Sequence, residues 1–259
     1  DLATIIQREE DFHPDKIWYV VDNRQGLHFT QVFRCAKKAG LVPPQTEFEF
    51  LGFGTMNGAD GKPYKTREGG IMKLEDMIAT VTAGAQEKLE ASSFVDEADY
   101  QDIALKVGVA AIKFGDLINQ RAKDYVFDLS KFFSFEGKTG PYLLYTITRI
   151  NSILKKAGVP ADQPLLLTGV YTDSERELLL KILMGGDVFQ RTLAEKAPNY
   201  LCEDAYQLAN SFSKFYHDNR IIDEPDEAKK QSWLALISLA RQVLCNHLDL
   251  LGIETVEHM

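Results

Sequence analysis

A strand-like run followed by a polar loop and an amphipathic helix constrains the fold of this chain most. Residues 17–21 (IWYVV) are β-branched and aromatic, which favours a buried parallel strand. A polar loop at 22–26 leads into a helix predicted over 27–39, and Gly40 stands just past its end. This order is half of a βαβ unit, in which ligands bind at the carboxyl ends of strands. The first half is therefore predicted to be α/β, with Gln25 and His28 at that edge.

The stretch after the next predicted strand (47–53) is rich in glycine and in cationic side chains. Glycines stand at 52, 54, 58, 61, 69 and 70, and Lys62, Lys65 and Arg67 lie among them. Such a loop can approach phosphate closely and neutralise its charge. It can equally be a mobile surface hairpin, because the Asn-Gly and Asp-Gly pairs at 57–58 and 60–61 are turn signals. The residues alone leave both interpretations open.

The order of the residues in this loop favours the phosphate interpretation. GKPYKTREGG at 61–70, followed by the helix-like MKLEDMI at 72–78, resembles the flexible signature loop of arginyl-tRNA synthetases, the counterpart of the class I K-M-S-K-S loop. The resemblance implies that ATP is a substrate, together with Mg²⁺, and that Lys65 contacts its α- and β-phosphates. It assigns catalytic roles to Lys62, Lys65, Thr66 and Arg67. It assigns ATP binding to Gly54, Met56, Lys62 and Lys65.

A second motif, YVVDNRQGLHFTQVF at 19–33, resembles the strand and turn of the same family. Without that context, Gln25 and His28 would be ordinary polar residues at a helix start. The resemblance implies that Gln25 contacts bound arginine and that His28 contacts the nucleoside part of ATP. It also implies that Asp1 pairs with the substrate guanidinium, which suits a planar, bidentate cation.

From about residue 130 the sequence carries almost only helical signals. Thr172 with Glu175 predicts a capping box that starts a helix, and the glycine pair at 185–186 predicts its end. Further helices are predicted at 141–157, 187–196, 198–218 and 226–251. We therefore expect an all-α domain at 130–259, after a domain at 1–129 that is the C-terminal half of a Rossmann-like catalytic domain with a helical connector.

The first of these helices carries a face of tyrosines and an arginine. Such a face is the rim of a core more often than a recognition surface, although it also suits stacking on bases and binding phosphate. FEGKTGPYLLYTITRINSIL at 135–154 resembles the opening helix of the anticodon-binding domain of arginyl-tRNA synthetases. The resemblance implies that tRNA(Arg) is a partner. The predicted tRNA-binding residues are Tyr142, Arg149, Tyr216, Arg220 and Met259.

Composition narrows the class of protein. The net charge of −9 and pI near 5.1 argue against indiscriminate binding of nucleic acid, so an RNA partner must meet a local basic patch. Three cysteines at spacings unlike a disulfide or zinc framework are expected to be reduced thiols of a cytoplasmic protein, without a structural metal. No apolar run approaches the ~20 residues of a membrane span.

The five histidines include no H-x-G-H motif, which class I synthetases also need for adenylation. We therefore expect a piece of an arginine–tRNA ligase that binds tRNA but does not catalyse on its own. The parent protein is expected to be a monomer. The alternative is a non-catalytic tRNA-binding or regulatory module derived from the same fold.

Overall fold

The computed structural model describes residues 1–58, 61, 73–90, 99–126, 134–160 and 166–259. The chain divides into two compact units. The strand unit comprises the described residues of Asp1–Thr66 and Gln120–Phe127, and the helical unit comprises those of Arg67–Asn119 and Asp128–Met259. The elements of the strand unit are α1 (Leu2–Phe12), β1 (Lys16–Asp22), the 3-10 turn η1 (Asn23–Gln25), α2 (Gly26–Lys38), β2 (Glu47–Phe53), β3 (Met56–Asn57) and β4 (Tyr125–Val126). Those of the helical unit are α3 (Leu74–Glu90), α4 (Tyr100–Leu117), α6 (Gly140–Lys156), α7 (Asp173–Glu195), α8 (Asn199–Asp218) and α9 (Glu227–Leu250).

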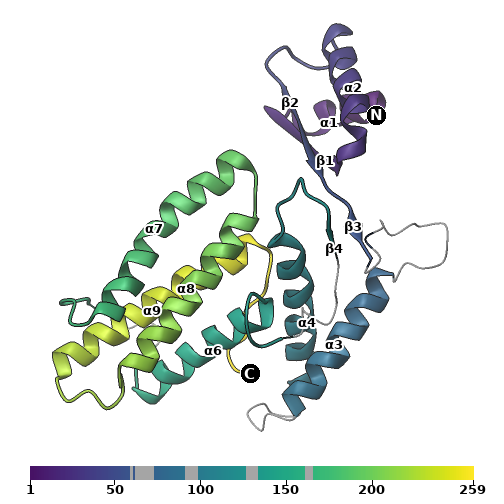
Figure 1. The fold of residues 1–259 in the computed structure, drawn as a ribbon. Helices are drawn as coiled ribbons and strands as arrows, with labels where there is room; N and C mark the ends of the chain where they lie inside the picture. Colours follow the sequence, from purple (N-terminus) through teal and green to yellow (C-terminus); the bar gives the residue numbers. More distant parts are fainter. Residues whose placement is uncertain (59–60, 62–72, 91–98, 127–133, 161–165) are drawn as a thin grey trace. The chain divides into compact units, whose positions relative to one another are not determined.

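The strand unit is built on a parallel pair of strands. β1 and β2 run in register from Lys16 opposite Glu47 to Asp22 opposite Phe53, with α2 between them in sequence (Figure 1). The predicted strands and helix are therefore confirmed, and they form a complete βαβ unit. The short strands β3 and β4 are also parallel.

One face of β1 carries the core of the strand unit. Side chains alternate along a strand, and Ile17 and Tyr19 are buried whereas Trp18 and Val20 are exposed. The Tyr19 ring lies 4.9 Å from the Phe29 ring of α2, which makes an apolar contact between strand and helix. The α2 helix therefore covers a single face of β1.

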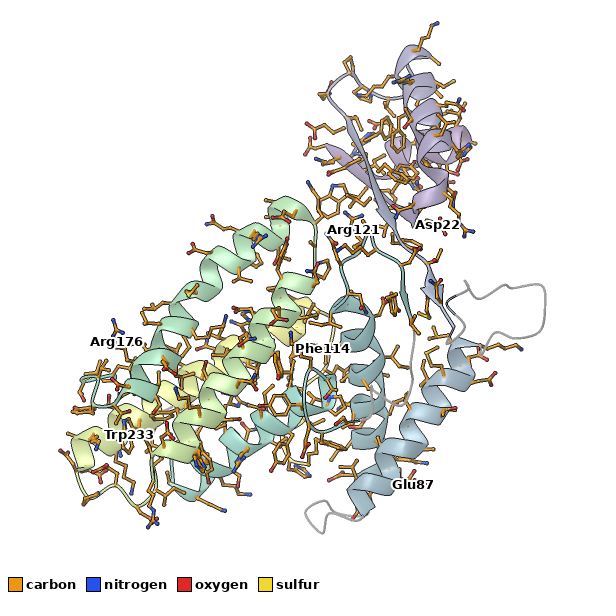
Figure 2. The ribbon with its side chains drawn as sticks, viewed as in Figure 1. Asp22, Glu87, Phe114, Arg121, Arg176 and Trp233 are labelled. Atoms are coloured by element: carbon orange, nitrogen blue, oxygen red, sulfur yellow. The ribbon has the colours of Figure 1, made fainter. Side chains whose placement is uncertain are left out.

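The helical unit is a bundle in which α7, α8 and α9 lie side by side and α3 packs against α4 (Figure 1). Its core includes Phe114, which is fully buried on α4 (Figure 2). The start of α6 crosses α4 so closely that a Cβ on Gly140 would lie 2.2 Å from the Ala110 carbonyl oxygen. Only glycine permits this approach.

The start of α7 carries the predicted cap of Thr172 and Glu175, with the return hydrogen bond made to the residue before the N-cap. The Glu175 amide donates to Thr172 Oγ1 at 3.2 Å, and the Glu175 carboxylate accepts from the Tyr171 amide at 2.7 Å. The same carboxylate accepts from the indole of Trp233 on α9 at 3.0 Å (Figure 2). The capping residue thus also ties α7 to α9.

The predicted end of this helix at residues 185–186 is wrong. The α7 helix continues to Glu195, and the helix predicted at 187–196 is its second half. Neither Gly185 nor Gly186 has the positive φ of a helix-ending glycine, whereas Lys196 takes the left-handed conformation at the true end, with φ of 48°. Packing of α7 as a whole against α8 and α9 keeps the helix continuous through the pair despite its low propensity.

The helices α3 and α4, which were predicted to form a connector, lie in the helical unit when the chain is divided into compact units. A boundary near residue 130 stays a prediction. Among the described helices, none combines the length and the apolarity that crossing a lipid bilayer requires.

Candidate functional sites

The carboxyl ends of β1 and β2 carry a cluster of polar groups. Asp22 ends β1, accepts from the Arg24 amide at 2.8 Å and pairs with the Arg24 guanidinium at 2.7 Å. These hydrogen bonds from the Arg24 side chain and backbone lower the pKa of the Asp22 carboxyl. The cluster therefore holds a fixed anion at the edge where ligands of such sheets bind.

Two predicted ligand-binding residues meet beside this edge. The Asp1 carboxylate lies 2.7 Å from His28 Nε2, and both side chains are about half exposed. Asp1 is predicted to bind arginine and His28 to bind ATP, and here each is the partner of the other. Gln25 immediately precedes α2, whose first turn carries His28. The three residues therefore come from neighbouring parts of one unit.

A segment that no sequence pattern indicated completes this end of the strand unit. Residues 120–126 return to it after α4, and Arg121 (Figure 2) donates to the Gly52 carbonyl oxygen. The Gly54 amide donates to the Arg121 carbonyl oxygen at 2.9 Å. Asn23 Nδ2 donates to the Ala122 carbonyl oxygen at 3.0 Å. Partners 69 and 99 residues apart leave no local signal, which is why the sequence did not indicate them.

Gly54, predicted to bind ATP, has a structural reason to be glycine. A Cβ there would lie 2.3 Å from the carbonyl carbon and oxygen of Lys123. Met56, also predicted to bind ATP, follows in β3 and pairs with Tyr125. The four residues with predicted catalytic roles (Lys62, Lys65, Thr66 and Arg67) lie outside the described residues.

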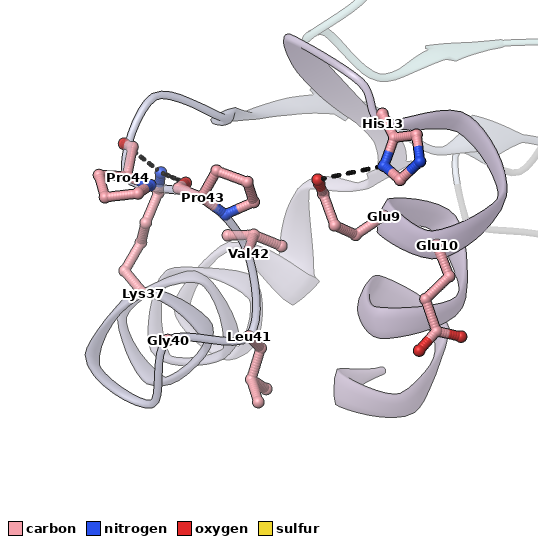
Figure 3. A pocket seen from close by; sticks show the side chains of 9 residues that line it. All are labelled: Glu9, Glu10, His13, Lys37, Gly40, Leu41, Val42, Pro43 and Pro44. Atoms are coloured by element: carbon pink, nitrogen blue, oxygen red, sulfur yellow. Dashed lines mark hydrogen bonds and ion pairs between the residues drawn. The ribbon is translucent and has the colours of Figure 1, made fainter.

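A hollow of about 760 Å³ lies at the opposite, amino ends of the strands (Figure 3). Lys37 donates there to the carbonyl oxygens of Pro43 and Pro44, so its ammonium group is engaged by the backbone. Glu9 lies 3.9 Å from His13. None of the residues with a predicted function lines this hollow.

The helical unit holds a groove of about 860 Å³ that brings three of the five predicted tRNA-binding residues together. Arg149 of α6, Tyr216 of α8 and Met259 all line it. The Arg149 guanidinium lies 4.4 Å from the centre of the Tyr216 ring, a cation–π geometry. Tyr216 and Met259 are half-buried and pack against the bundle core. The groove thus combines an aromatic face, an apolar side chain and a cation.

The charges around the groove are mainly positive. Lys155, Lys156 and Arg241 line it together with Arg149, whereas Glu257 is its acidic residue. On a chain of net charge −9, such a local cluster suits a polyanion. No group of three His, Cys, Asp or Glu residues that could hold a metal ion occurs among the residues that the structure describes.

The other two predicted tRNA-binding residues lie outside the groove lining. Tyr142 points its hydroxyl to α8, where it donates to Asn210 Oδ1 at 3.0 Å. Arg220 is exposed just after α8. Asn151 and Arg241, which the sequence did not indicate, do line the groove.

Two family models cover nearly the whole chain. The model described as "tRNA synthetases class I (R), catalytic domain" matches residues 1–129, and the DALR anticodon binding domain matches residues 143–259. The chain is 51% identical over 260 residues to the arginine–tRNA ligase of Alkaliphilus oremlandii and 45% identical over 264 residues to that of Hyphomonas neptunium. All of this chain is matched, but only 44% of each relative. It thus spans less than half the length of these curated relatives.

Solved structures give the same similarity. The arginyl-tRNA synthetase of Plasmodium falciparum matches with a TM-score of 0.80 at 27% identity, over 100% of this chain and 44% of that one. The arginyl-tRNA synthetase of Thermus thermophilus matches with a TM-score of 0.79 at 27% identity, over 95% of this chain and 41% of that one. A methionyl-tRNA synthetase of Mycobacterium tuberculosis, at 12% identity and a TM-score of 0.61, shares the fold.

Proposed function

Because this chain belongs to the arginyl-tRNA synthetase family, we propose that it forms part of an arginine–tRNA ligase, which activates arginine with ATP and transfers it to tRNA(Arg). The chain spans 44% of its curated relatives, so we assign it a share of that activity rather than the whole. Its α/β part contributes to the adenylation site and its helical part binds the anticodon. We propose a monomeric, cytoplasmic parent protein.

The observation that carries this proposal is the groove between α6, α8 and the end of the chain. An unpaired base can stack on Tyr216, whose ring already holds the Arg149 guanidinium, while Met259 supplies an apolar wall. The surrounding Lys155 and Lys156 can neutralise the flanking phosphates. This is the chemistry that reading a single-stranded RNA loop requires.

At the strand unit, the proposed roles are those that the family resemblance implies. The Asp1 carboxylate binds the guanidinium of arginine, with Gln25 beside it, and His28 contacts the nucleoside of ATP. Asp1 and His28 pair with each other at 2.7 Å, so both substrates must replace this contact. Lys65, assisted by Lys62, Thr66 and Arg67, neutralises the phosphates while the arginine carboxylate attacks the α-phosphate, which forms arginyl-adenylate and releases the β- and γ-phosphates as pyrophosphate. Mg²⁺ would accompany ATP and supply further positive charge to the phosphates.

The test is binding of the 259-residue chain to tRNA(Arg) transcripts with the natural anticodon and with altered anticodon bases, over a salt series. We expect the altered anticodon to weaken binding beyond the electrostatic background that salt removes. Equal binding of both transcripts at every salt concentration would refute anticodon reading by this groove.

A second assay addresses catalysis. We expect no ATP–pyrophosphate exchange from this chain alone, even with arginine and tRNA, because transition-state stabilisation requires donors on both sides of the phosphates. Measurable exchange by the purified chain would contradict the proposed division of the active site. Exchange by a longer chain that contains these residues would distinguish a ligase from a non-catalytic tRNA-binding module.

A further inference from the structure

We infer that Asn151 and Arg241 are positioning residues, which fix the segment 252–259 so that Met259 lies in the groove. The inference rests on the proposed RNA-binding function of the groove and adds to it the residues that shape its apolar wall.

The two residues form a chain of contacts from α9 through α6 to this segment. Arg241 Nε donates to Asn151 Oδ1, and Asn151 Nδ2 donates to the Glu257 carbonyl oxygen at 3.0 Å. Because a guanidinium only donates, it fixes the orientation of the Asn151 amide, and the NH₂ group must then face the carbonyl. Arg241 Nη2 also lies 3.7 Å from Glu257 Oε1. The bond thus fixes the backbone two residues before Met259.

The earlier part of the segment is held separately. Ile253 and Val256 are buried, and Lys113 donates to the Gly252 carbonyl oxygen. After Val256, the only buried or half-buried side chain is that of Met259 itself. Among the described contacts at residues 257 and 258, those that remain are a second contact of Asn151 Nδ2, 3.4 Å from Glu257 Oε2, and one between His258 and Asp99, at 3.7 Å and about half exposed. Asn151 and Arg241 therefore supply the described polar contacts of Glu257, and Met259 adds its own packing against the bundle core.

Asn151 is not a core residue of the bundle. Its neighbours Ile150 and Ile153 are buried in the bundle core, whereas Asn151 is only half-buried. Asn151→Leu keeps the size and the net charge, removes both hydrogen bonds and favours the helix. The matched control is Asn246→Leu, the same change at an exposed position of α9 outside the groove lining.

The direct readout is the methyl signal of Met259 in the spectrum of ¹³C-methyl-methionine-labelled protein. The chain has five methionines, and Met259→Leu identifies the signal by its loss. We expect Asn151→Leu to shift and sharpen this signal while Asn246→Leu leaves it in place. An unchanged Met259 signal in Asn151→Leu would overturn the inference.

The second readout is affinity for an anticodon stem-loop of tRNA(Arg). We expect Asn151→Leu to weaken binding about tenfold, the scale of one to two hydrogen bonds, and Asn246→Leu to leave it unchanged. In a Met259→Ala background, the same Asn151→Leu change should cost less than about twofold, because the side chain that it positions is already gone. An equal loss in both backgrounds would overturn the inference, since Asn151 would then act on the RNA directly.

The two readouts separate this inference from the proposed function. If the unchanged chain shows no anticodon-dependent binding, the proposed function fails, and the Met259 signal still decides whether Asn151 positions the segment.

Discussion

The Asp204 carboxylate on α8 lies 3.0 Å from His247 Nε2 on α9, and both side chains are buried. Lys181 of α7 lies 2.5 Å from the other oxygen of the carboxylate. His247 Nδ1 lies 2.7 Å from the Val243 carbonyl oxygen, so both ring nitrogens face oxygen atoms. One buried anion thus joins three helices of the bundle.

This arrangement predicts acid sensitivity of the helical unit. Burial acts to raise the pKa of Asp204, but hydrogen bonds from His247 and Lys181 outweigh it and lower the pKa overall. A lowered pKa stabilises the fold above the unfolded value of about 3.9, and this stability is lost as the pH falls through the folded pKa. We expect the free energy of unfolding to fall in that acid range, and to fall less steeply in Asp204→Asn. If the free energy of unfolding falls equally steeply with pH in the unchanged protein and in Asp204→Asn, this prediction is wrong.

Asp204→Ala should destabilise the bundle by about 3 kcal/mol, because the Lys181 ammonium and the buried His247 ring lose their partner. Urea unfolding followed by Trp233 fluorescence in a Trp18→Phe background reports on this unit alone, since the chain has two tryptophans. A loss below about 1 kcal/mol would show that the ion pair is not stabilising.

Glu175→Ala should cost about 2 kcal/mol, because it removes the capping box and leaves the buried Trp233 indole without its acceptor. Glu175→Gln retains an acceptor oxygen of similar reach and should cost distinctly less. The same fluorescence assay, on Trp233 itself, measures both variants. If both lose equal stability, the charge rather than the hydrogen bonds stabilises the cap.

Gly186→Ala should stabilise the protein by about 1 kcal/mol. The residue lies in the interior of α7, and a Cβ there would have nothing within 4 Å, so alanine gains helix propensity without a clash. Gly108→Ala in α4 is the opposite control, because its Cβ would lie 2.9 Å from Val81 Cγ2. The midpoint temperature of thermal unfolding should rise for Gly186→Ala and fall for Gly108→Ala.

Gly54→Ala should loosen the end of the strand unit where residues 120–126 attach, because the new Cβ clashes with the Lys123 backbone. Hydrogen exchange of the Tyr125 amide, which donates to the Thr55 carbonyl oxygen at 3.1 Å, should accelerate about tenfold or more. Gly26→Ala, whose Cβ would make ordinary 3.5 Å contacts with Phe50, should leave this exchange unchanged.

Arg149→Ala should weaken anticodon stem-loop binding by about 1 to 3 kcal/mol and reduce its salt dependence. Lys214→Ala removes one positive charge equally, but Lys214 pairs with Glu177 and lies outside the groove lining. It should therefore change binding little. Equal losses for the two variants would mean that only net charge matters.

Local patterns predicted the elements of this fold well, because short-range chemistry decides them. The β-branched and aromatic run from Ile17 to Val21 and the pairing of Thr172 with Glu175 each depend on residues within a few positions. Gly185 and Gly186 were misinterpreted because packing of the whole α7 helix against α8 and α9 outweighs their low propensity, which a single sequence does not show.

The residues of the candidate sites also include some that the sequence indicated and some that it missed. Arg149, Tyr216 and Met259, which the resemblance implies as tRNA-binding residues, line one groove, and their binding of tRNA stays a prediction. Arg121, Asn151 and Arg241 were missed because their partners are remote in sequence: 69 residues for Arg121 to Gly52, and 106 for Asn151 to Glu257. The residues that neighbour Arg121, Asn151 and Arg241 in the sequence therefore give no signal of these contacts.

The return of residues 120–126 to the strand unit also bears on how the protein is made. A ribosome finishes β2 well before Arg121 and Asp124 exist, yet these residues supply hydrogen bonds to Gly52 and to the Thr55 amide. The β1–α2–β2 segment must therefore wait, incompletely bonded, while α3 and α4 are synthesised. During translation this interval is the period in which the nascent strand unit is open to misassociation and to chaperones.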